Sequence, residues 1–401
     1  MAQYNTDIFN VKMYDKNGVE YSIDTSSIES LYFIEDIFSF CMTGKLKFTD
    51  HGTVLEKGNF WGYGDESVSI VYNNTIKEFK IYKINSQLPT QTDLEKKNVF
   101  EIIIVSPLYY KWHFKQYSRS WKDTKTSDIM SHIMKHMIGD EFYSKTFEPS
   151  NERIEHFYTG LRSPAENFSY LMERSTGVIT NLPGYICFEN LDGYNLTTLP
   201  NLMKNSAEIM EPKERDNIKY WFHNENPYLK NKILSFERYG ADNGSMLRLS
   251  GGHRIGYDIK RKKNFDNYYT YRQARVKFVD SLLGNDQYPI LDPSITGQER
   301  YFKTGESRED FVDNIYYNNW IKQYSNQQLF NIYVSGDDKR KAGGVIQIEW
   351  PSNINNNINN NFTGKYFVKS VVHYFYKEQP PYYNQKLILM KNSYDGINIL
   401  S

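Results

Sequence analysis

The sequence predicts a β-rich α+β protein because it is rich in aromatic residues, poor in the best helix former and full of alternating segments. Aromatic residues make up 16% of the 401 residues, with 34 Tyr and 24 Phe. Such side chains suit pleated, half-buried strands. Ala is scarce and Asn is abundant, which disfavours long helices. We therefore expect mostly antiparallel sheet with long polar loops.

The first hundred residues alternate polar and apolar side chains, as strands do when one face lies in a core. Asn17-Gly18 separates two such segments, and this pair favours a tight hairpin turn because it tolerates positive φ. Further strands are expected at residues 44–48, 68–72, 79–84 and 99–105. We assign residues 1–106 to a first β-barrel domain.

Two amphipathic helices are predicted after residue 107. Residues 126–138 carry apolar side chains at helical spacing, namely Ile129, Met130, Ile133, Met134 and Met137. A second helix starts with Ser163 as N-cap, Pro164 at the first helical position and Glu166 completing a capping box. Strands are expected at residues 177–180 and 184–189, joined by a turn. Residues 107–228 then form an α+β domain.

A second β region follows the helical one. Strand-like segments lie at residues 233–238, 246–250, 330–334, 345–350, 366–372 and 386–390. Residues 263–324 are polar, rich in Tyr and Asn, and irregular, so we interpret them as an insertion. A second β-barrel domain then comprises residues 229–262 and 325–401. Its run Asn353 to Asn361 holds seven Asn and two Ile, which is typical of a solvated loop.

The two β regions repeat each other in order and spacing. The segments 44–48, 68–72, 79–84 and 99–105 correspond to 330–334, 345–350, 366–372 and 387–390, with comparable loops between them. Residues 77–81 even resemble residues 365–369. Four similar strands in the same order favour a duplicated module. The fold class is therefore two similar antiparallel β-barrels with an α+β domain between them and an irregular insertion.

Charge and cysteine content exclude several classes of protein. Lys plus Arg and Asp plus Glu each number 48, so the net charge is zero, which argues against a general nucleic-acid binder. Cys41 and Cys187 are the only cysteines, too few for a Cys-based zinc site or a disulfide framework, and we expect two buried thiols. The N-terminus lacks a signal-peptide pattern. No apolar run approaches the ~18 residues that span a bilayer.

Several residues are candidates for a metal-binding or catalytic site. His132 and His136 lie four apart on a predicted helix, a spacing that can hold zinc, but no third ligand is evident and we favour two histidines without a metal. Carboxylates such as Glu35, Asp36, Glu173 and Glu189 could serve a glycosidase, which needs two acids at a defined separation. We interpret them as surface charge, and Glu166 as a helix cap.

Other motifs are interpreted as structural. The segment Gly240 to Gly244, and Gly251-Gly252, lack the context of a phosphate loop and are expected to form turns or bulges. The basic run Lys260 to Lys263 precedes Tyr268, Tyr269 and Tyr271 and is expected to be a solvated loop. Aromatic rings that could line a sugar site are expected in cores or interfaces instead: Trp112, Trp121, Trp221, Trp320 and Trp350. We predict no catalytic, cofactor-binding or metal-binding residue.

The order of these segments resembles a known family. Barrel strands lead into Ile104-Val105-Ser106-Pro107-Leu108, then come an amphipathic helix, the Pro-Ala-Glu-Asn-Phe-Ser-Tyr-Leu helix at residues 164–171, the Gly-Tyr-Ile-Cys-Phe-Glu segment at 184–189 and a second barrel. This order resembles the central baseplate hub protein of contractile-tailed bacteriophages and the related hub part of type VI secretion spike proteins. The resemblance covers residues 1–262 and 325–395. Residues 343–348, 364–368 and 372–373 are the most similar to that family.

The resemblance implies a structural virion protein of the phage tail baseplate, assembled in the host cytoplasm. It implies tube-like barrels and a homotrimer whose pseudo-sixfold ring joins the tail tube to a threefold spike. Its implied partners are the tail tube protein, a spike or cell-puncturing protein and other baseplate proteins, with no membrane span and no sequence-specific nucleic acid. Two alternatives stay open: a carbohydrate- or receptor-binding tail protein, and a tail-associated glycan hydrolase.

Overall fold

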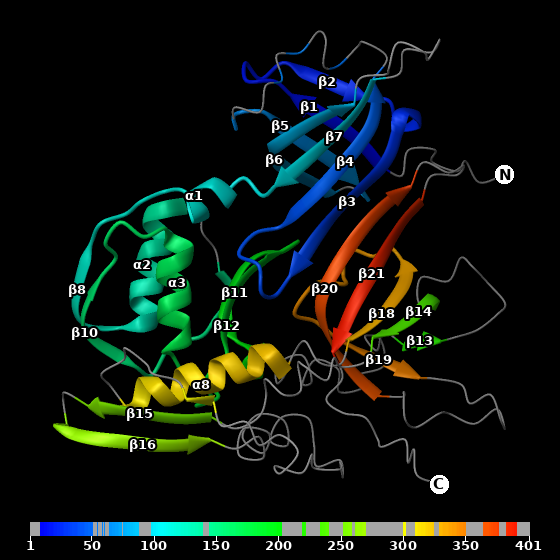
Figure 1. Cartoon of the computed structure of the whole chain (residues 1–401). Coiled ribbons are helices and arrows are strands. Elements are labelled where there is room, and N and C mark those ends of the chain that lie inside the picture. Colours follow the sequence, from blue (N-terminus) through cyan, green and yellow to red (C-terminus); the bar gives the residue numbers. More distant parts are fainter. Residues whose placement is uncertain are drawn as a thin grey trace, which may run out of the picture.

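The fold was obtained as a computed structural model of the chain. It describes residues 9–50, 54, 58, 60, 64–73, 75–87, 98–138, 144–202, 219–221, 233–239, 252–258, 261–269, 300–301, 309–324, 329–349, 364–376 and 382–390. Most of the described chain is β-sheet with a few helices (Figure 1). This confirms the predicted β-rich α+β class.

The first β region forms a curled antiparallel sheet. Its elements are β1 (Phe9–Tyr14), β2 (Glu20–Ile23), the 3-10 helix η1 (Thr25–Ser27), β3 (Ile28–Asp36), β4 (Thr43–Asp50), β5 (Ser67–Tyr72), β6 (Thr75–Gln87) and β7 (Asn98–Val105). β1 and β2 pair as the predicted hairpin, with Gly18 at φ +78° in the turn. We call β3 to β7 the first module.

The second β region repeats this arrangement. Its elements are β13 (Lys219–Trp221), β14 (Ile233–Tyr239), β18 (Leu329–Ser335), β19 (Val345–Glu349), β20 (Gly364–Tyr376) and β21 (Tyr382–Met390). The sheet order is β3-β4-β7-β6-β5 in the first module and β14-β18-β21-β20-β19 in the second, with all neighbours antiparallel. We call these five strands the second module. The duplication predicted from the sequence is confirmed by topology.

The two modules also share their irregularities. The β3–β4 ladder skips one residue between the pairs Ile28–Phe48 and Ser30–Lys47, and the β14–β18 ladder skips one between Ile233–Val334 and Ser235–Tyr333. A second skip falls at Tyr82 in β6 and at Lys369 in β20. Because a bulge bends its strand and increases the twist, matching bulges curl both sheets at the same places.

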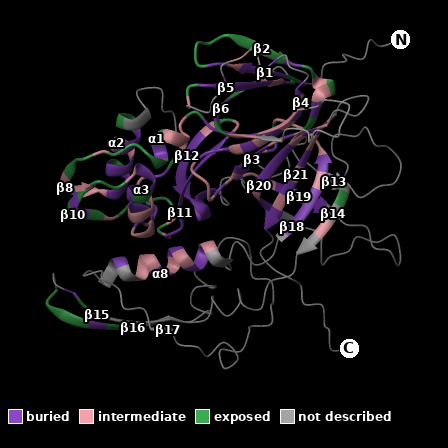
Figure 2. Cartoon of the chain, turned by 45° about the horizontal axis from the view of Figure 1, so that its top comes forward, coloured by how far each residue is buried: buried purple, intermediate pink, exposed green. Residues whose placement is uncertain are grey.

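Each module has its own apolar core, and further cores lie where the parts of the chain meet (Figure 2). The core of the first module is completed by Phe375 and Tyr383 of the second. A third core brings together Ile37 of the first module, Phe188 of the middle region and Phe367 of the second module. The modules and the middle region are therefore packed through shared apolar contacts.

The middle region is an α+β unit. It comprises α1 (Tyr109–His113), β8 (Ser120–Lys125), α2 (Thr126–Ile138), β9 (Ser144–Phe147), β10 (Arg153–Tyr158), α3 (Pro164–Glu173), β11 (Tyr185–Asn190) and β12 (Gly193–Thr198). Helix α2 has the predicted bounds. Its buried residues share a core with those of α3, β11 and β12.

The predicted capping box at the start of α3 is confirmed. The Ser163 side chain accepts from the Glu166 backbone N–H, and the Glu166 carboxylate accepts from the Ser163 N–H at 2.7 Å. Pro164 occupies the first turn of the helix. The Ser163 N–H and hydroxyl both donate to the Glu166 carboxylate and lower its pKa.

We expect Ser163→Ala to lower the free energy of unfolding by about 1 kcal/mol, since it removes one cap of an otherwise unchanged helix. Urea denaturation followed by circular dichroism measures this loss. Ser163→Asn retains a capping oxygen and should restore most of the stability. Equal losses for both variants would show that the loss does not come from the missing capping oxygen.

One predicted strand is wrong. Residues 177–180 form a turn, and β11 pairs with β12 instead. The fully buried Glu148 holds this turn, because its carboxylate accepts from the Ile179 and Thr180 backbone N–H groups and from the Thr198 hydroxyl at 2.6 Å. Val178 and Ile179 are exposed. Their strand-like composition therefore does not reflect burial in a sheet.

Residues 252–324, which include the predicted insertion 263–324, contain regular elements. β15 (Gly252–Asp258), β16 (Lys263–Tyr269) and β17 (Arg300–Tyr301) form a separate sheet, and α8 (Glu309–Tyr324) lies between that sheet and α3 (Figure 1). Helix α8 docks through two asparagines. Asn314 donates to the Arg174 carbonyl, and Asn318 donates to the Glu173 carbonyl at 2.9 Å while accepting from the Gly184 N–H. These bonds satisfy carbonyl groups at the C-terminus of α3.

Candidate functional site at the seam between the modules

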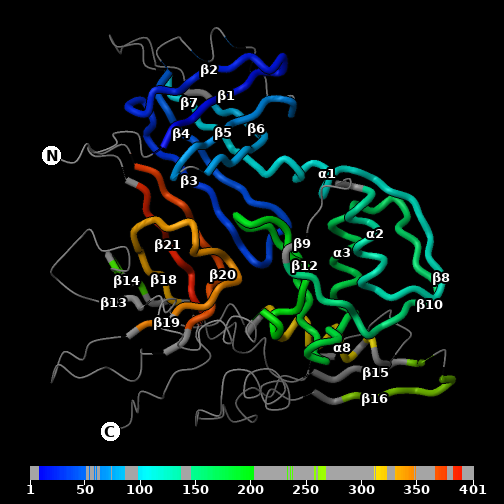
Figure 3. Tube along the Cα trace, turned by 180° about the vertical axis from the view of Figure 1, so that it is seen from behind, coloured from blue at the N-terminus to red at the C-terminus, as the bar shows by residue number. Residues whose placement is uncertain are grey.

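In the described part of the chain, one pair of strands joins the two modules into one sheet. β3 of the first module pairs antiparallel with β20 of the second, from Asp36–Ser370 to Leu31–Phe375. Figure 3 shows the two strands side by side, with the middle region against one end. We call this pairing the seam. It fixes the relative orientation of the modules.

A buried carboxylate lies in the seam, in the pair next to its Asp36 end. Glu35 is 0% exposed. It accepts hydrogen bonds from His373 Nε2 at 3.0 Å, from the Ala342 N–H at 2.9 Å and from the Leu191 N–H at 3.3 Å. These donors belong to β20, to the loop before β19 and to the β11–β12 turn. One side chain therefore ties both modules to the middle region.

The network extends from His373 into the second module. The Gln385 amide donates to the Tyr383 hydroxyl at 2.9 Å, and that hydroxyl lies 2.6 Å from His373 Nδ1. Because the Tyr383 hydroxyl accepts from Gln385, its own proton is left for Nδ1, and burial raises the pKa of Tyr383. His373 Nε2 then donates to Glu35. The ring of Phe33 stacks on the imidazole at 4.3 Å and excludes water from the bond.

A second buried cluster joins the first module to the middle region. Glu189 accepts from the Met42 N–H at 3.2 Å and from the Tyr194 hydroxyl at 3.3 Å, and Lys77 Nζ lies 3.5 Å from the carboxylate. The Cys41 thiol contacts the Tyr194 hydroxyl at 3.4 Å. Burial raises the pKa of Cys41. Both cysteines are free and buried, as predicted.

The interpretation of Glu35 and Glu189 as surface charge is wrong. Both side chains are buried and hold separate segments together. The Asp36 carboxylate accepts hydrogen bonds from the Phe38 N–H at 2.8 Å and from the Ser370 hydroxyl. At Glu173, the main-chain carbonyl accepts a hydrogen bond from the Asn318 side chain. Alternation gave a signal for Glu35, because it shares a face with the buried Leu31 and Phe33. A polar residue on the core face of a strand requires a partner.

The histidine pair lies on the face of α2 against the β8–β10 ribbon. The rings of His132 and His136 are 4.2 Å apart, and Arg119 Nη1 lies 3.0 Å from His136 Nε2. The guanidinium makes this an unfavourable place for a cation. Among the described residues, no group of three or more His, Cys, Asp or Glu side chains is placed to hold a metal ion.

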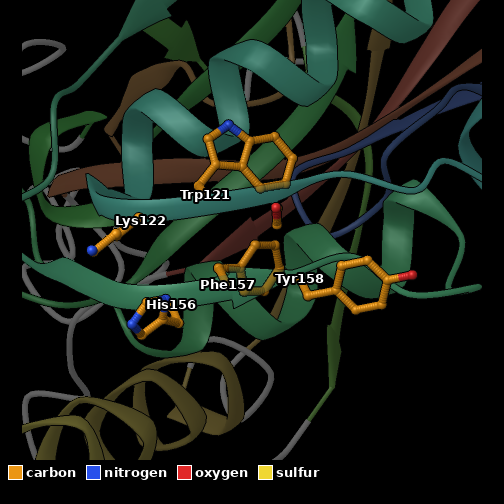
Figure 4. Close-up of a pocket in the computed structure, with 6 residues that line it drawn as sticks. Trp121, Lys122, His156, Phe157 and Tyr158 are labelled. Atoms are coloured by element: carbon orange, nitrogen blue, oxygen red, sulfur yellow. The ribbon is translucent and has the colours of Figure 1, made fainter.

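A shallow pocket of about 460 Å³ lies on the same ribbon, lined by Ser120, Trp121, Lys122, His156, Phe157 and Tyr158. Figure 4 shows Lys122 and His156 together at one end and Tyr158 at the other. Trp121 packs edge-on against His132 and beside Phe157. The pocket combines aromatic surface with a few polar groups, as ligand sites do.

The remaining candidates from the sequence either have a structural role or an exposed position, or lie outside the described residues. Trp112 and Trp320 are buried in cores. Arg261 and Lys262 are exposed in the β15–β16 turn, and Arg261 N–H donates to Asp258. Lys260, Tyr271, the segments 240–244 and 353–361, and the side chains of Trp221, Tyr268, Tyr269 and Trp350 lie outside the described part. Within the described chain, no helix has the length and apolar character needed to cross a bilayer.

Comparison with solved structures identifies the fold. The sequence matches no family model and no curated protein. The structure is similar to the 43 kDa tail protein of prophage MuSo2 from Shewanella oneidensis, with a TM-score of 0.59 and 7% identity over 96% of this chain and 98% of that one. The chain has the fold of phage tail proteins.

Two further structures support this assignment. The tail protein from Neisseria meningitidis MC58 has a TM-score of 0.59 and 8% identity, over 96% of each chain. A chain of a PdpA–VgrG complex has a TM-score of 0.50 and 12% identity, over 96% of this chain and 64% of that one. These likenesses agree in fold with the family that the sequence resembles.

Proposed function

We propose that this tail-fold protein is a baseplate hub that forms a homotrimeric, pseudo-sixfold ring between a sixfold tail tube and a threefold spike. The observation that carries the proposal is the duplicated five-strand module, with the same strand order, register and bulges in both copies. A chain with two like modules presents six of them when three copies close around an axis. Such a ring is a geometric adaptor between the two symmetries.

We propose that the protein acts by binding its partners and does not catalyse a reaction. Glu35 and Glu189 are occupied in buried structural networks, so we propose that the chain is not a glycan hydrolase. Its proposed partners are the tail tube protein, a spike or cell-puncturing protein and other baseplate proteins. We place it in the virion of a contractile-tailed phage, after assembly in the host cytoplasm.

The proposed domain division follows the modules, except that β13 pairs with β19 of the second barrel and β15 pairs with β16 of the insertion. The first barrel takes residues 1–106, the α+β domain residues 107–228, and the second barrel residues 229–262 and 325–401 around the insertion 263–324. β15 pairs with β16 and β17 rather than with the second module. The sheet of the insertion therefore starts before residue 263.

We expect the purified protein to be a trimer at micromolar concentration, with three times the 47.4 kDa mass of one chain. Light scattering coupled to size-exclusion chromatography measures this mass directly. A monomer or dimer that persists across that concentration range would contradict the proposed ring.

The pocket on the β8–β10 ribbon favours one alternative, a carbohydrate- or receptor-binding tail protein. Trp121 and Tyr158 offer aromatic surface, and Lys122 and His156 offer hydrogen-bonding groups. A glycan array tests this alternative. Specific binding that is lost in Tyr158→Ala, while the trimer persists, would add sugar recognition to the hub. Binding by a monomer would replace the hub proposal.

A further inference from the structure

The seam inside one chain suggests how two chains meet. The seam pairs the first strand of the first module, β3, with the fourth strand of the second module, β20. If the same pairing is repeated from the second module onward, the first strand of a second module lies beside the fourth strand of a first module. Those strands are β14 and β6. In one chain six strands lie between them along the sheet, so the partner must be the β6 of another copy.

Both strands have an edge ready for such a partner. β14 stands at the end of the sheet path and pairs, among the described strands, with β18 alone. β5 covers one edge of β6 over Thr75–Lys80, while the described pairing of Lys83 to Gln87 is with β7 on the other edge. In β20 the equivalent edge is covered first by β19 and then, from Ser370, by β3.

The backbone hydrogen bonds of β6 and β20 match at the position where the first neighbouring strand ends. The Ile81 N–H donates to the Glu66 carbonyl at 3.1 Å, and the equivalent Val368 N–H donates to the Gly344 carbonyl at 2.8 Å. Next comes the bulge residue, Tyr82 or Lys369. The Lys369 carbonyl accepts from the Ile37 N–H at 3.2 Å, which is where β3 begins to pair. Tyr82 occupies the same position and is 40% exposed.

We propose that β14 of one copy pairs antiparallel with β6 of the next copy, in the register of the seam. The pairs Ile34–Val372, Phe33–His373 and Tyr32–Tyr374 of the seam become Tyr239–Asn85, Arg238–Ser86 and Glu237–Gln87. This inference rests on the proposed trimer and names the strands that close it. Three such pairings, alternating with three seams, make one continuous sheet around the ring.

The proposal gives the two kinds of joint different chemistry. The position of His373 in the seam is taken by Ser86 between copies, so the joint between copies lacks the imidazole that bonds to Glu35. A free strand edge favours uncontrolled pairing, and a defined neighbour removes that hazard. The seam forms when the chain folds, whereas the β14–β6 joint forms between folded chains and buries no histidine–carboxylate pair.

Paired cysteines test the register. Because Ile37 and Lys369 share a backbone hydrogen bond, Ile34–Val372 is a non-hydrogen-bonded pair, with Cα atoms about 4.5 Å apart in such ladders. That spacing suits a disulfide. The double variant Asn85→Cys, Tyr239→Cys should therefore oxidise to covalently linked dimers and trimers on a non-reducing gel. The native Cys41 and Cys187 are buried, so they contribute little background.

The matched control is Asn85→Cys with Glu237→Cys, which moves one cysteine two residues along β14. We expect at least tenfold less crosslinking than for the first pair. Ser86→Pro gives a second test, because the equivalent His373 N–H points across the seam and proline removes that donor without touching the β7 ladder. We expect Ser86→Pro to weaken the trimer at least tenfold.

The outcomes separate this inference from the proposed function. A trimer by mass with no preference for the 85–239 pair, or with Ser86→Pro unaffected, overturns the β14–β6 joint and leaves the trimer standing. A wild-type protein that stays monomeric overturns both. Preferential 85–239 crosslinking within a trimer supports both.

Discussion

Glu35→Ala should lower the free energy of unfolding by about 3–5 kcal/mol, the cost of leaving one side of a buried polar pair without its partner. The variant leaves His373 Nε2 and the Ala342 and Leu191 N–H groups without their acceptor in a dry environment. Each such group costs about 1–3 kcal/mol when water cannot replace the partner. Urea denaturation monitored by tryptophan fluorescence measures the shift.

Glu29→Ala is the matched control for this prediction. Glu29 lies on the same strand and pairs with Lys47 at 2.7 Å, but both side chains are about one-third exposed. A surface ion pair contributes only about 0–1 kcal/mol. Similar losses for Glu35→Ala and Glu29→Ala would contradict the role given to the seam network. A loss confined to Glu35→Ala would support it.

Phe33→Ala should be comparably damaging, with a loss of about 3–5 kcal/mol for deleting a fully buried phenyl ring. Phe33 is 0% exposed, and its ring contacts Phe79 of the first module as well as His373 and Phe375 of the second. The cavity would open at the point where the modules share a core. Thermal and urea unfolding both report this loss.

Val19→Ala serves as the control for Phe33→Ala because Val19 is 48% exposed. We expect its effect to stay within about 0.5 kcal/mol. Phe33→Leu should fall between the two, since leucine refills part of the space. The opposite ranking would mean that the core does not continue across the seam.

The sequence predicted those parts of the fold that depend on local patterns. Alternation located most strands of both modules, and the order of strands revealed the duplication. The capping box at Ser163 and Glu166 fixed the start of α3. The helical spacing of residues 126–138 gave α2 its bounds. These signals need only residues close in the chain, so tertiary contacts did not override them.

The sequence did not predict features that depend on distant partners. Glu35 is buried because donors from β20, the loop before β19 and the β11–β12 turn converge on it. Helix α8 was hidden because part of its buried face is polar, with Asn318 inserted between the C-terminus of α3 and Gly184. Residues 177–180 have strand composition but form a turn around Glu148.

The central claim is that three chains with twin modules close into one ring. Electron microscopy of the purified protein tests it most directly. We expect end-on class averages to show a closed ring of six similar lobes with exact threefold symmetry only, because successive lobes differ in sequence. Single two-lobed particles, or a ring built from six whole chains, would contradict the claim.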